Sequence, residues 1–191
     1  MKILTDSARV KHLLEKTLVE QLKENSTILL LRKVLGESKS YGDKLLLAGG
    51  AVVDILEGRN PKDFDFVNWG KSDLDKFRKA GFKHTYTTKS SITMEKDGII
   101  IQFISFELKQ FGFKIEQSTY DIVKEDLTID EDSFTNKVLI PVNFDDFQNL
   151  RSAVFRIPHW VGKGYHIPDI TYLSLMSCTF GLLAASKHKN S

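Results

Sequence analysis

The stretch Leu45 to Val67 reads LLLAGGAVVDILEGRNPKDFDFV, and it is the most informative part of the sequence about secondary structure and chemistry. Its apolar start predicts a strand that runs into the glycine pair Gly49-Gly50. A short helix over Ala51 to Glu57 should follow, ended by Gly58, because glycine readily adopts the left-handed conformation found at helix ends. Free N–H groups at the start of such a helix attract anions, so the turn is either a phosphate cradle or a tight turn with no ligand.

Two acidic residues alternate with two phenylalanines at the end of this stretch. Asp63 and Asp65 should project from one face of a strand over Asp63 to Val67, while Phe64 and Phe66 point into the core. The two Cα atoms would lie about 6.6 Å apart, so the carboxylates can converge on a hard cation. Magnesium held in this way contacts the phosphates of a nucleoside triphosphate. The alternative is a solvated strand face, although adjacent like charges are unfavourable there without compensation.

Composition is that of an ordinary globular protein. The 191 residues are 41% hydrophobic and 27% charged, which suffices for one domain with a substantial core. The net charge of +2 excludes a strongly basic nucleic-acid binder. The lone Cys178 excludes an internal disulfide and fits a reducing compartment. Because there is no signal-peptide core and the apolar run Ile170 to Ala185 is too short for a membrane span, we expect a cytoplasmic protein without a membrane partner.

Periodicity and turn residues predict the remaining elements. Helices are expected over residues 7–25, 72–79, 145–154 and 169–187, with a capping box at Ser72 and Asp75 and an irregular stretch between Pro158 and Pro168. Strands are expected over residues 84–88, 91–96, 99–105, 127–129 and 137–142, with a tight hairpin at Asp97-Gly98 and the last two paired. The sequence does not decide between helix and strand for residues 27–35. Residues 36–43 suggest a polar loop, and the ambiguous segment 107–124 suggests a loop with a short helix. The fold class is therefore α+β.

Three motifs of the quoted stretch resemble those of one enzyme superfamily. They are Gly49-Gly50-Ala51-Val52-Val53-Asp54, Glu57-Gly58-Arg59 and Pro61-Lys62-Asp63-Phe64-Asp65. In order and spacing they resemble the head domain of polymerase-β-type nucleotidyltransferases, and more specifically the class II CCA-adding and poly(A) polymerase enzymes with their short bacterial and phage relatives. Weaker matches follow at residues 101–105, 125–130 and 156–168. The resemblance implies a nucleotidyltransferase fold, a mixed β-sheet flanked by helices with a small helical C-terminal part.

The resemblance also implies a site for phosphoryl transfer from a nucleoside triphosphate (NTP). Asp63 and Asp65 would be catalytic and would bind Mg²⁺, or Mn²⁺ in its place. The nucleotide would be bound by Gly49 and Gly50 at the triphosphate, Arg59 and Lys62 at phosphate charge, Asp126 at the ribose, Arg156 at phosphate or base, and Asp54. An acceptor hydroxyl on RNA, a protein or a small molecule would displace pyrophosphate. Residues 1–145 would form the catalytic domain, and residues 146–191 a helical extension packed on it.

Three residues depart from the family pattern. Val53 replaces an arginine, Gln102 stands where an acid is often found, and Glu125 reverses the charge of the sugar motif. Glu107 would be a substitute acid, although no spacing argument supports it. The departures favour an alternative, a catalytically silent relative that binds a nucleotide, RNA or a protein. A CCA-adding role on tRNA is not expected, because those enzymes hold tRNA with extra helical domains and only residues 169–191 follow the matched region.

Overall fold

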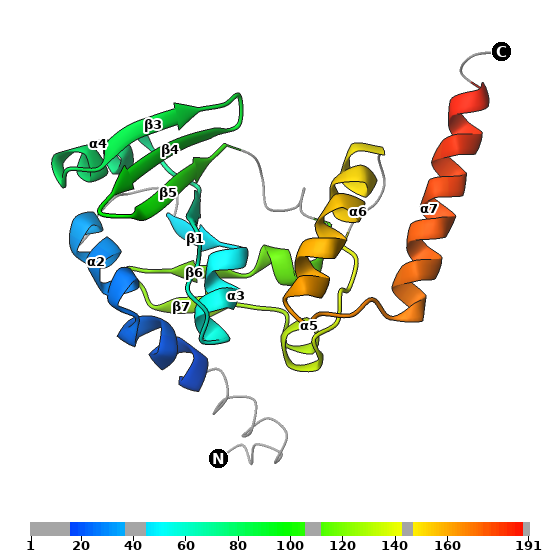
Figure 1. The fold of residues 1–191 in the computed structure, drawn as a ribbon, viewed down its shortest axis with the longest axis horizontal. Coiled ribbons are helices and arrows are strands. Elements are labelled where there is room, and N and C mark those ends of the chain that lie inside the picture. Colours follow the sequence, from blue (N-terminus) through cyan, green and yellow to red (C-terminus); the bar gives the residue numbers. More distant parts are fainter. Residues whose placement is uncertain (1–15, 37–44, 106–111, 143–146, 189–191) are drawn as a thin grey trace, which may run out of the picture. The chain divides into compact units, whose positions relative to one another are not determined.

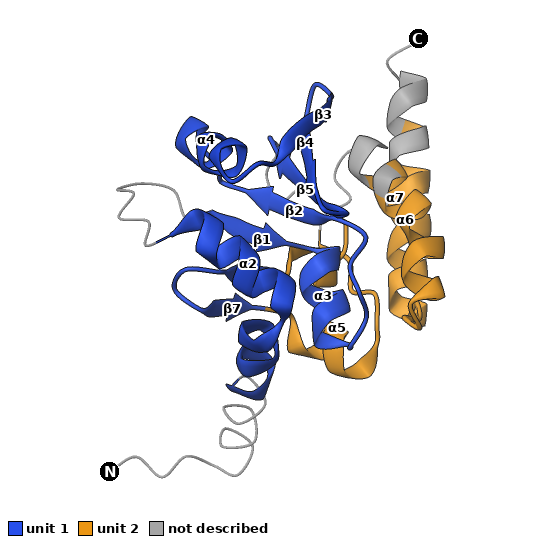
Figure 2. Ribbon diagram, turned by 60° about the vertical axis from the view of Figure 1, so that its left-hand side comes forward, with its two compact units in different colours: residues 1–105, 119–128 blue, residues 106–118, 129–191 orange. Residues whose placement is uncertain are grey.

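The computed structural model describes residues 16–36, 45–105, 112–142 and 147–188 (Figure 1). The chain divides into two compact units, residues 1–105 with 119–128 and residues 106–118 with 129–191 (Figure 2). The first unit carries the sheet and the second is mainly helical, so the predicted α+β class is confirmed. The predicted domains, divided after residue 145, do not coincide with these compact units and stay a prediction.

The first unit contains most of the predicted elements. Its helices are residues 16–24, α2 (Ser26–Leu35), α3 (Gly50–Leu56) and α4 (Lys71–Lys79). Its strands are β1 (Leu46–Ala48), β2 (Phe64–Val67), β3 (Lys83–Thr87), β4 (Ser91–Lys96), β5 (Ile99–Ile104), β6 (Thr119–Asp121) and β7 (Asp126–Thr128). The undecided residues 27–35 are helical, because the Asn25 side chain accepts hydrogen bonds from the N–H groups of Thr27 and Ile28, both at 3.1 Å. The start of the first predicted helix, the loop at 37–43 and Glu107 lie outside the described residues.

The strands of the first unit form one mixed sheet in the order β3-β4-β5-β2-β1-β6-β7. The pair β2 and β5 is parallel, and every other neighbouring pair is antiparallel. One row of paired residues across the sheet is Ile92, Phe103, Phe66, Leu47, Tyr120 and Leu127. The adjacent row is Tyr86, Thr93, Gln102, Asp65, Ala48, Thr119 and Thr128. Because successive residues of a strand point to opposite faces, the second row lies on the other face, termed here the Asp65 face.

A cluster of aromatic rings forms the core between the sheet and α4. Phe77 of α4 is fully buried, and its ring centroid lies 5.8 Å from that of Phe66 and 5.4 Å from that of Phe103. Phe82 adds an edge-on contact to Phe77 at 5.2 Å. These contacts occupy the face opposite Asp65, so the packing of α4 fixes which face of β2 points away from the core.

Among its described residues, the second unit contains a short 3₁₀-helix and three α-helices. They are η2 (Lys114–Gln117), α5 (Glu131–Asn136), α6 (Phe147–Gly162) and α7 (Asp169–His188). The predicted pairing of strands 127–129 and 137–142 is wrong, because β7 pairs with β6. Asp130 caps α5 between them, and Lys137 ends that helix in the left-handed conformation. Residues 137–142 therefore form only isolated bridges, at Val138 and Pro141.

Two predicted helix boundaries are also wrong. The cap of α4 is Gly70 instead of Ser72, since the Asp73 carboxylate accepts a hydrogen bond from the Gly70 N–H at 2.9 Å. The helix α6 continues through Pro158 to Gly162, past its predicted end at residue 154 and into the stretch predicted to be irregular. A proline removes the hydrogen bond to the carbonyl four residues earlier, and here both Pro158 and Val154 are exposed, so water can satisfy that carbonyl. In the part of the chain that the structure describes, no helix has the length and apolarity needed to cross a membrane.

Truncation of Phe77 to alanine should destabilise the protein by about 3–5 kcal/mol, because it removes a fully buried ring from the aromatic cluster. Urea unfolding of wild type and Phe77→Ala measures this loss. The matched control is Phe180→Ala in α7, whose side chain is 64% exposed and should change stability by less than about 0.5 kcal/mol. Equal effects of the two substitutions would contradict the assigned core.

Candidate active site

Asp63, Asp65 and Gln102 meet on the Asp65 face. Asp65 lies within β2, where it pairs in register with Gln102 of β5. Asp63 directly precedes β2, and the side-chain amide of Gln102 donates a hydrogen bond from Nε2 to Asp63 Oδ2 at 3.1 Å. One glutamine side chain is thus the strand neighbour of one acid and the hydrogen-bond partner of the other, which puts both acids on one face.

Burial of the intervening phenylalanines holds the acids in this orientation. Phe64 is 5% exposed and Phe66 is fully buried, whereas Asp63 and Asp65 are half-buried. A slip of β2 by one residue would bury two carboxylates and expose two phenyl rings. The cost of such a slip is several kcal/mol from the rings alone, so the orientation of the acids is tightly specified.

The glycine turn lies beside the start of β2. Ala48, the last residue of β1, pairs with Asp65, and the antiparallel register brings the chain out of β1 alongside the point at which β2 begins. Gly49 has φ 63° and ψ −125°, a conformation that side chains rarely allow. No side chain caps the first turn of α3, which begins at Gly50. Backbone N–H groups at the glycine turn therefore lie close to the acidic pair.

Arg59 is held by two carboxylates at the end of α3. Its Nε and Nη2 atoms lie 2.9 and 2.8 Å from Asp54 Oδ1, and it also forms an ion pair with Glu57. Its backbone N–H donates to the Asp54 carbonyl at 2.7 Å. Arg59 and Asp54, both predicted to bind nucleotide, thus form a clamp on the turn that leads to Asp63. The charge of Arg59 is balanced within this clamp.

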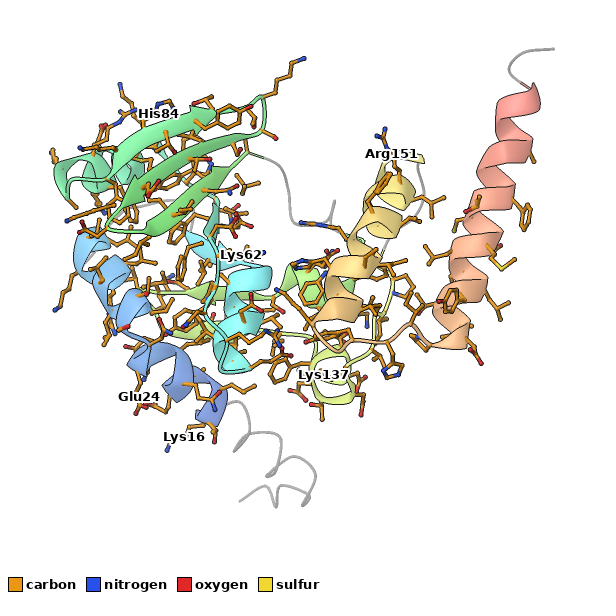
Figure 3. The ribbon with its side chains drawn as sticks, in the orientation of Figure 1. Lys16, Glu24, Lys62, His84, Lys137 and Arg151 are labelled. Atoms are coloured by element: carbon orange, nitrogen blue, oxygen red, sulfur yellow. The ribbon has the colours of Figure 1, made fainter. Side chains whose placement is uncertain are left out.

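The other predicted nucleotide-binding residues are distributed over both units. Lys62 is exposed and directly precedes Asp63 (Figure 3). Asp126 begins β7, three strands from β2, which corresponds to about 14 Å across the sheet. Arg156 belongs to α6 in the second unit, where its Nε lies 3.3 Å from Glu116 Oε1. The structure therefore brings Lys62, but not Asp126, next to the acidic pair.

Comparison with solved structures identifies this arrangement of strands and helices. A Thermotoga maritima CCA-adding enzyme complexed with tRNA matches 84% of this chain, with a TM-score of 0.69 and 18% sequence identity. A CCA-adding enzyme in complex with CTP matches 87% of the chain, with a TM-score of 0.70 and 18% identity. The chain has the nucleotidyltransferase fold.

The chain spans less than half the length of the solved proteins to which it is similar. The matched part is 44% of the tRNA-bound enzyme and 46% of the CTP-bound enzyme. A CCA-adding enzyme in complex with ATP matches 83% of this chain, with a TM-score of 0.62, 19% identity and 44% of its own chain covered. No protein-family model and no curated protein matches the sequence.

The side chains of Asp63 and Asp65 form a donor set that suits one magnesium ion. Asp63 and Asp65 supply hard carboxylate oxygens on one face, and proteins hold Mg²⁺ through one or two carboxylates, with water and substrate phosphates as further ligands. A group of three acidic, histidine or cysteine side chains suited to a metal does not occur among the described residues. Gln102 occupies the position expected for a third acid and donates an amide hydrogen where a carboxylate would add charge.

Glu125 has a structural role that its sequence did not indicate. Its carboxylate forms ion pairs with Lys23, at 2.7 Å between Lys23 Nζ and Glu125 Oε2, and with Arg32 of α2. The pKa of Glu125 is lowered mainly by the hydrogen bond from Lys23, and the hydrogen bond and charge of Arg32 lower it further. The reversed charge in the sugar motif therefore joins the N-terminal helices to the β6–β7 turn. Since these partners are more than 90 residues away, sequence spacing gave no signal for them.

Glu116 is a second residue that sequence reasoning missed. It is 3% exposed, and its carboxylate accepts hydrogen bonds from Trp160 Nε1 at 2.9 Å and from the Phe113 backbone N–H at 3.1 Å. Arg156 also lies against it. A buried carboxylate is stable only with such donors. Glu116 therefore holds α6 against η2 within the second unit, and it also orients Arg156.

Replacement of Glu125 by glutamine should lower the stability of the protein at neutral pH. Because the folded-state pKa of Glu125 is lowered, its ion pairs stabilise the fold above the ordinary carboxyl pKa of 4.5, and this stabilisation is lost as the pH falls through the folded-state value. Thermal unfolding of wild type and Glu125→Gln from pH 7 to pH 3 should show two midpoints that converge at low pH. Glu24→Gln, an exposed control in the helix 16–24, should match wild type throughout.

Proposed function

We propose that the protein is a metal-dependent nucleotidyltransferase that moves a nucleoside monophosphate from an NTP to an acceptor hydroxyl and releases pyrophosphate. The observation that carries this proposal is the pair Asp63 and Asp65, linked by Gln102 on one sheet face beside a glycine turn. Support also comes from the shared fold, since solved proteins with this fold are CCA-adding enzymes in complex with CTP or ATP.

In this proposal the two carboxylates hold Mg²⁺, or Mn²⁺, against the triphosphate. The bound cation would neutralise phosphate charge as it develops in the transition state. Gly49 and Gly50 would offer backbone N–H groups to the phosphates. Lys62 would add a positive charge, because it is exposed and adjacent to Asp63. The ion pairs of Arg59 with Asp54 and Glu57 stabilise the turn that leads to Asp63. Arg59 would contact phosphate only after these ion pairs break.

The reaction would proceed by in-line displacement at the α-phosphorus. The acceptor oxygen forms the new bond to phosphorus while the bond to the pyrophosphate oxygen breaks. The proton of the acceptor hydroxyl would pass to a carboxylate oxygen of Asp63 or Asp65. Asp126 would contact the ribose and Arg156 a phosphate or the base, as the resemblance implies.

Gln102 supports a second candidate, a protein of this fold that binds a nucleotide without transferring it. The side-chain amide of Gln102 donates a hydrogen bond to Asp63 Oδ2 and carries no charge. A site with two carboxylates holds one cation more readily than two, which weakens charge neutralisation of the leaving group. The two candidates differ in turnover, since only an enzyme releases pyrophosphate.

Removal of either acid should abolish transfer. With Mg²⁺ and α-labelled NTPs, the wild type should release pyrophosphate and transfer label, and Asp63→Ala and Asp65→Ala should each lower the rate by at least about 100-fold, since charge stabilisation of the transition state is lost. The matched control is Asp75→Ala, which removes an exposed acid of α4 paired only locally with Arg78 and should retain the wild-type rate. A wild type that binds NTP with no turnover would support the second candidate instead.

Introduction of a third acid should strengthen metal binding. Gln102→Glu places a carboxylate next to Asp63 and Asp65, so the affinity for Mn²⁺ should rise several-fold because one more hard oxygen ligand is available. Titration calorimetry with Mn²⁺ measures this change. Without metal, the added like charge should lower the unfolding temperature. Unchanged Mn²⁺ affinity in Gln102→Glu would mean that the acids do not share a cation on this face.

A further inference from the structure

The helix α7 packs within the second unit along one of its sides. It runs beside α6 (Figure 1). Thr171 is fully buried, and its Oγ1 donates a hydrogen bond to the Leu139 carbonyl at 2.8 Å, while Leu175 is also buried. Because Thr171 and Leu175 are four residues apart, they lie above one another and define the inner side of the helix.

The opposite side of α7 carries a strip of exposed apolar residues, termed here the outer strip. It consists of Leu173, Met176 and Phe180, which are 62%, 53% and 64% exposed. Their spacing of three and four residues puts them on one side of the helix. Residues two apart on a helix are rotated by about 200°, so Leu173 points away from Thr171 and Leu175. Solvent therefore covers a side of α7 that is as apolar as a core helix.

The exposed apolar area of α7 is large enough for an interface. Ile170 and Tyr172 flank the outer strip and are also more than half exposed. With the outer strip they expose on the order of 600 Å², the upper end of the largest apolar patch on a typical monomer. Covered by an equal area, this surface would bury about 1,200 Å² in total, which is the lower end of stable, specific interfaces.

Charged residues mark the two ends of the helix. Residues 170–186 contain no aspartate, glutamate, lysine or arginine, whereas Asp169 precedes them and Lys187 follows them. The midpoint between Asp169 and Lys187 coincides with the midpoint between Met176 and Phe180. The order of residues is therefore symmetric about one point of α7, with a negative residue at one end and a positive residue at the other.

We propose that the outer strip of α7 binds the same strip of a second copy of this chain, with the two helices antiparallel. A two-fold axis through the shared midpoint would place Met176 of one copy against Phe180 of the other. The same axis brings Asp169 of each copy to the position of Lys187 in the opposite helix. Leu173 extends the apolar contact toward both ends. This inference concerns assembly and does not depend on the proposed function.

The symmetry of the strip favours a second copy over a lipid surface or an unrelated protein. Helices that lie on membranes carry lysine and arginine along a polar face, and residues 170–186 have neither. An unrelated protein requires no symmetric order of residues, whereas self-association across a two-fold axis does. Spacing by three and four residues is that of helices that interlock in pairs. A parallel pair would set like charges against each other at both ends, so the antiparallel pair is favoured.

Sedimentation equilibrium of the full chain over a range of concentrations tests the proposal. Wild type should approach twice the mass of one chain and dissociate on dilution. Phe180→Glu should weaken association at least about tenfold, because a charge would be buried between the helices. Leu173→Glu, on the same strip, should act in the same way. The matched control Tyr86→Glu changes an equally exposed aromatic residue of β3 and should dimerise as wild type does.

An exchange of the terminal charges tests the antiparallel orientation. Asp169→Lys and Lys187→Glu should each weaken the dimer about threefold or more, because like charges then meet at both ends. The variant with both substitutions should regain an affinity within about twofold of wild type. Each substitution is unfavourable for the helix dipole, so recovery in the double variant can come only from the contact between copies.

Three results would overturn the proposal. They are a wild type that stays monomeric at every concentration, Phe180→Glu and Leu173→Glu variants that dimerise as wild type does, and a double charge variant no tighter than the single ones. A monomeric wild type that binds lipid vesicles would assign the outer strip to a membrane surface instead. Circular dichroism should show unchanged helix content in every variant, because the altered side chains are not part of the core. In dilute solution the copies are separate, so Phe180→Ala should leave the unfolding of the chain unchanged there.

Discussion

The alternation of burial along β2 is the constraint on which the rest of the structure depends. Phe66 is fully buried against Phe77 and Phe103, and this packing fixes the strand with Asp65 on the opposite face. Asp63 directly precedes β2, and the hydrogen bond from Gln102 Nε2 holds its carboxylate on the same face. The hydrophobic core thus orients Asp65, and Gln102 holds Asp63 on the same face.

The contacts of Gln102, Glu125 and Val53 give each departure from the resembled family pattern a structural explanation. Gln102 lies where a third acid would add charge, and it donates a hydrogen bond to Asp63 instead. Glu125 is acidic where the family pattern has an arginine, and its carboxylate forms ion pairs with Lys23 and Arg32. These ion pairs anchor the N-terminal helices to the β6–β7 turn. Val53 is fully buried in α3, where an arginine would need polar partners. Gln102 thus lies beside the acidic pair, whereas Glu125 and Val53 contribute to the structure of the first unit.

Local patterns predicted the central part of the fold well and the long-range contacts poorly. The alternation at Asp63 to Val67 and the Asp97-Gly98 hairpin are local, and both residues of that hairpin turn have positive φ, at 51° and 79°. The strand β6 lies within residues 107–124, where the sequence shows no clear period of either helix or strand. Ion pairs of Glu125 and the burial of Glu116 depend on residues distant in sequence, so no spacing rule could reveal them. The pairing of 127–129 with 137–142 failed because the helix α5 lies between them.

A crystal structure with Mn²⁺ and a non-hydrolysable NTP would show directly whether Asp63 and Asp65 bind the same cation. Anomalous scattering locates the metal independently of its ligands. We expect one Mn²⁺ peak within coordination distance of carboxylate oxygens from both Asp63 and Asp65, with triphosphate oxygens completing its coordination. A peak bound by only one of the two acids, or a nucleotide seated away from the Asp65 face, would contradict this expectation.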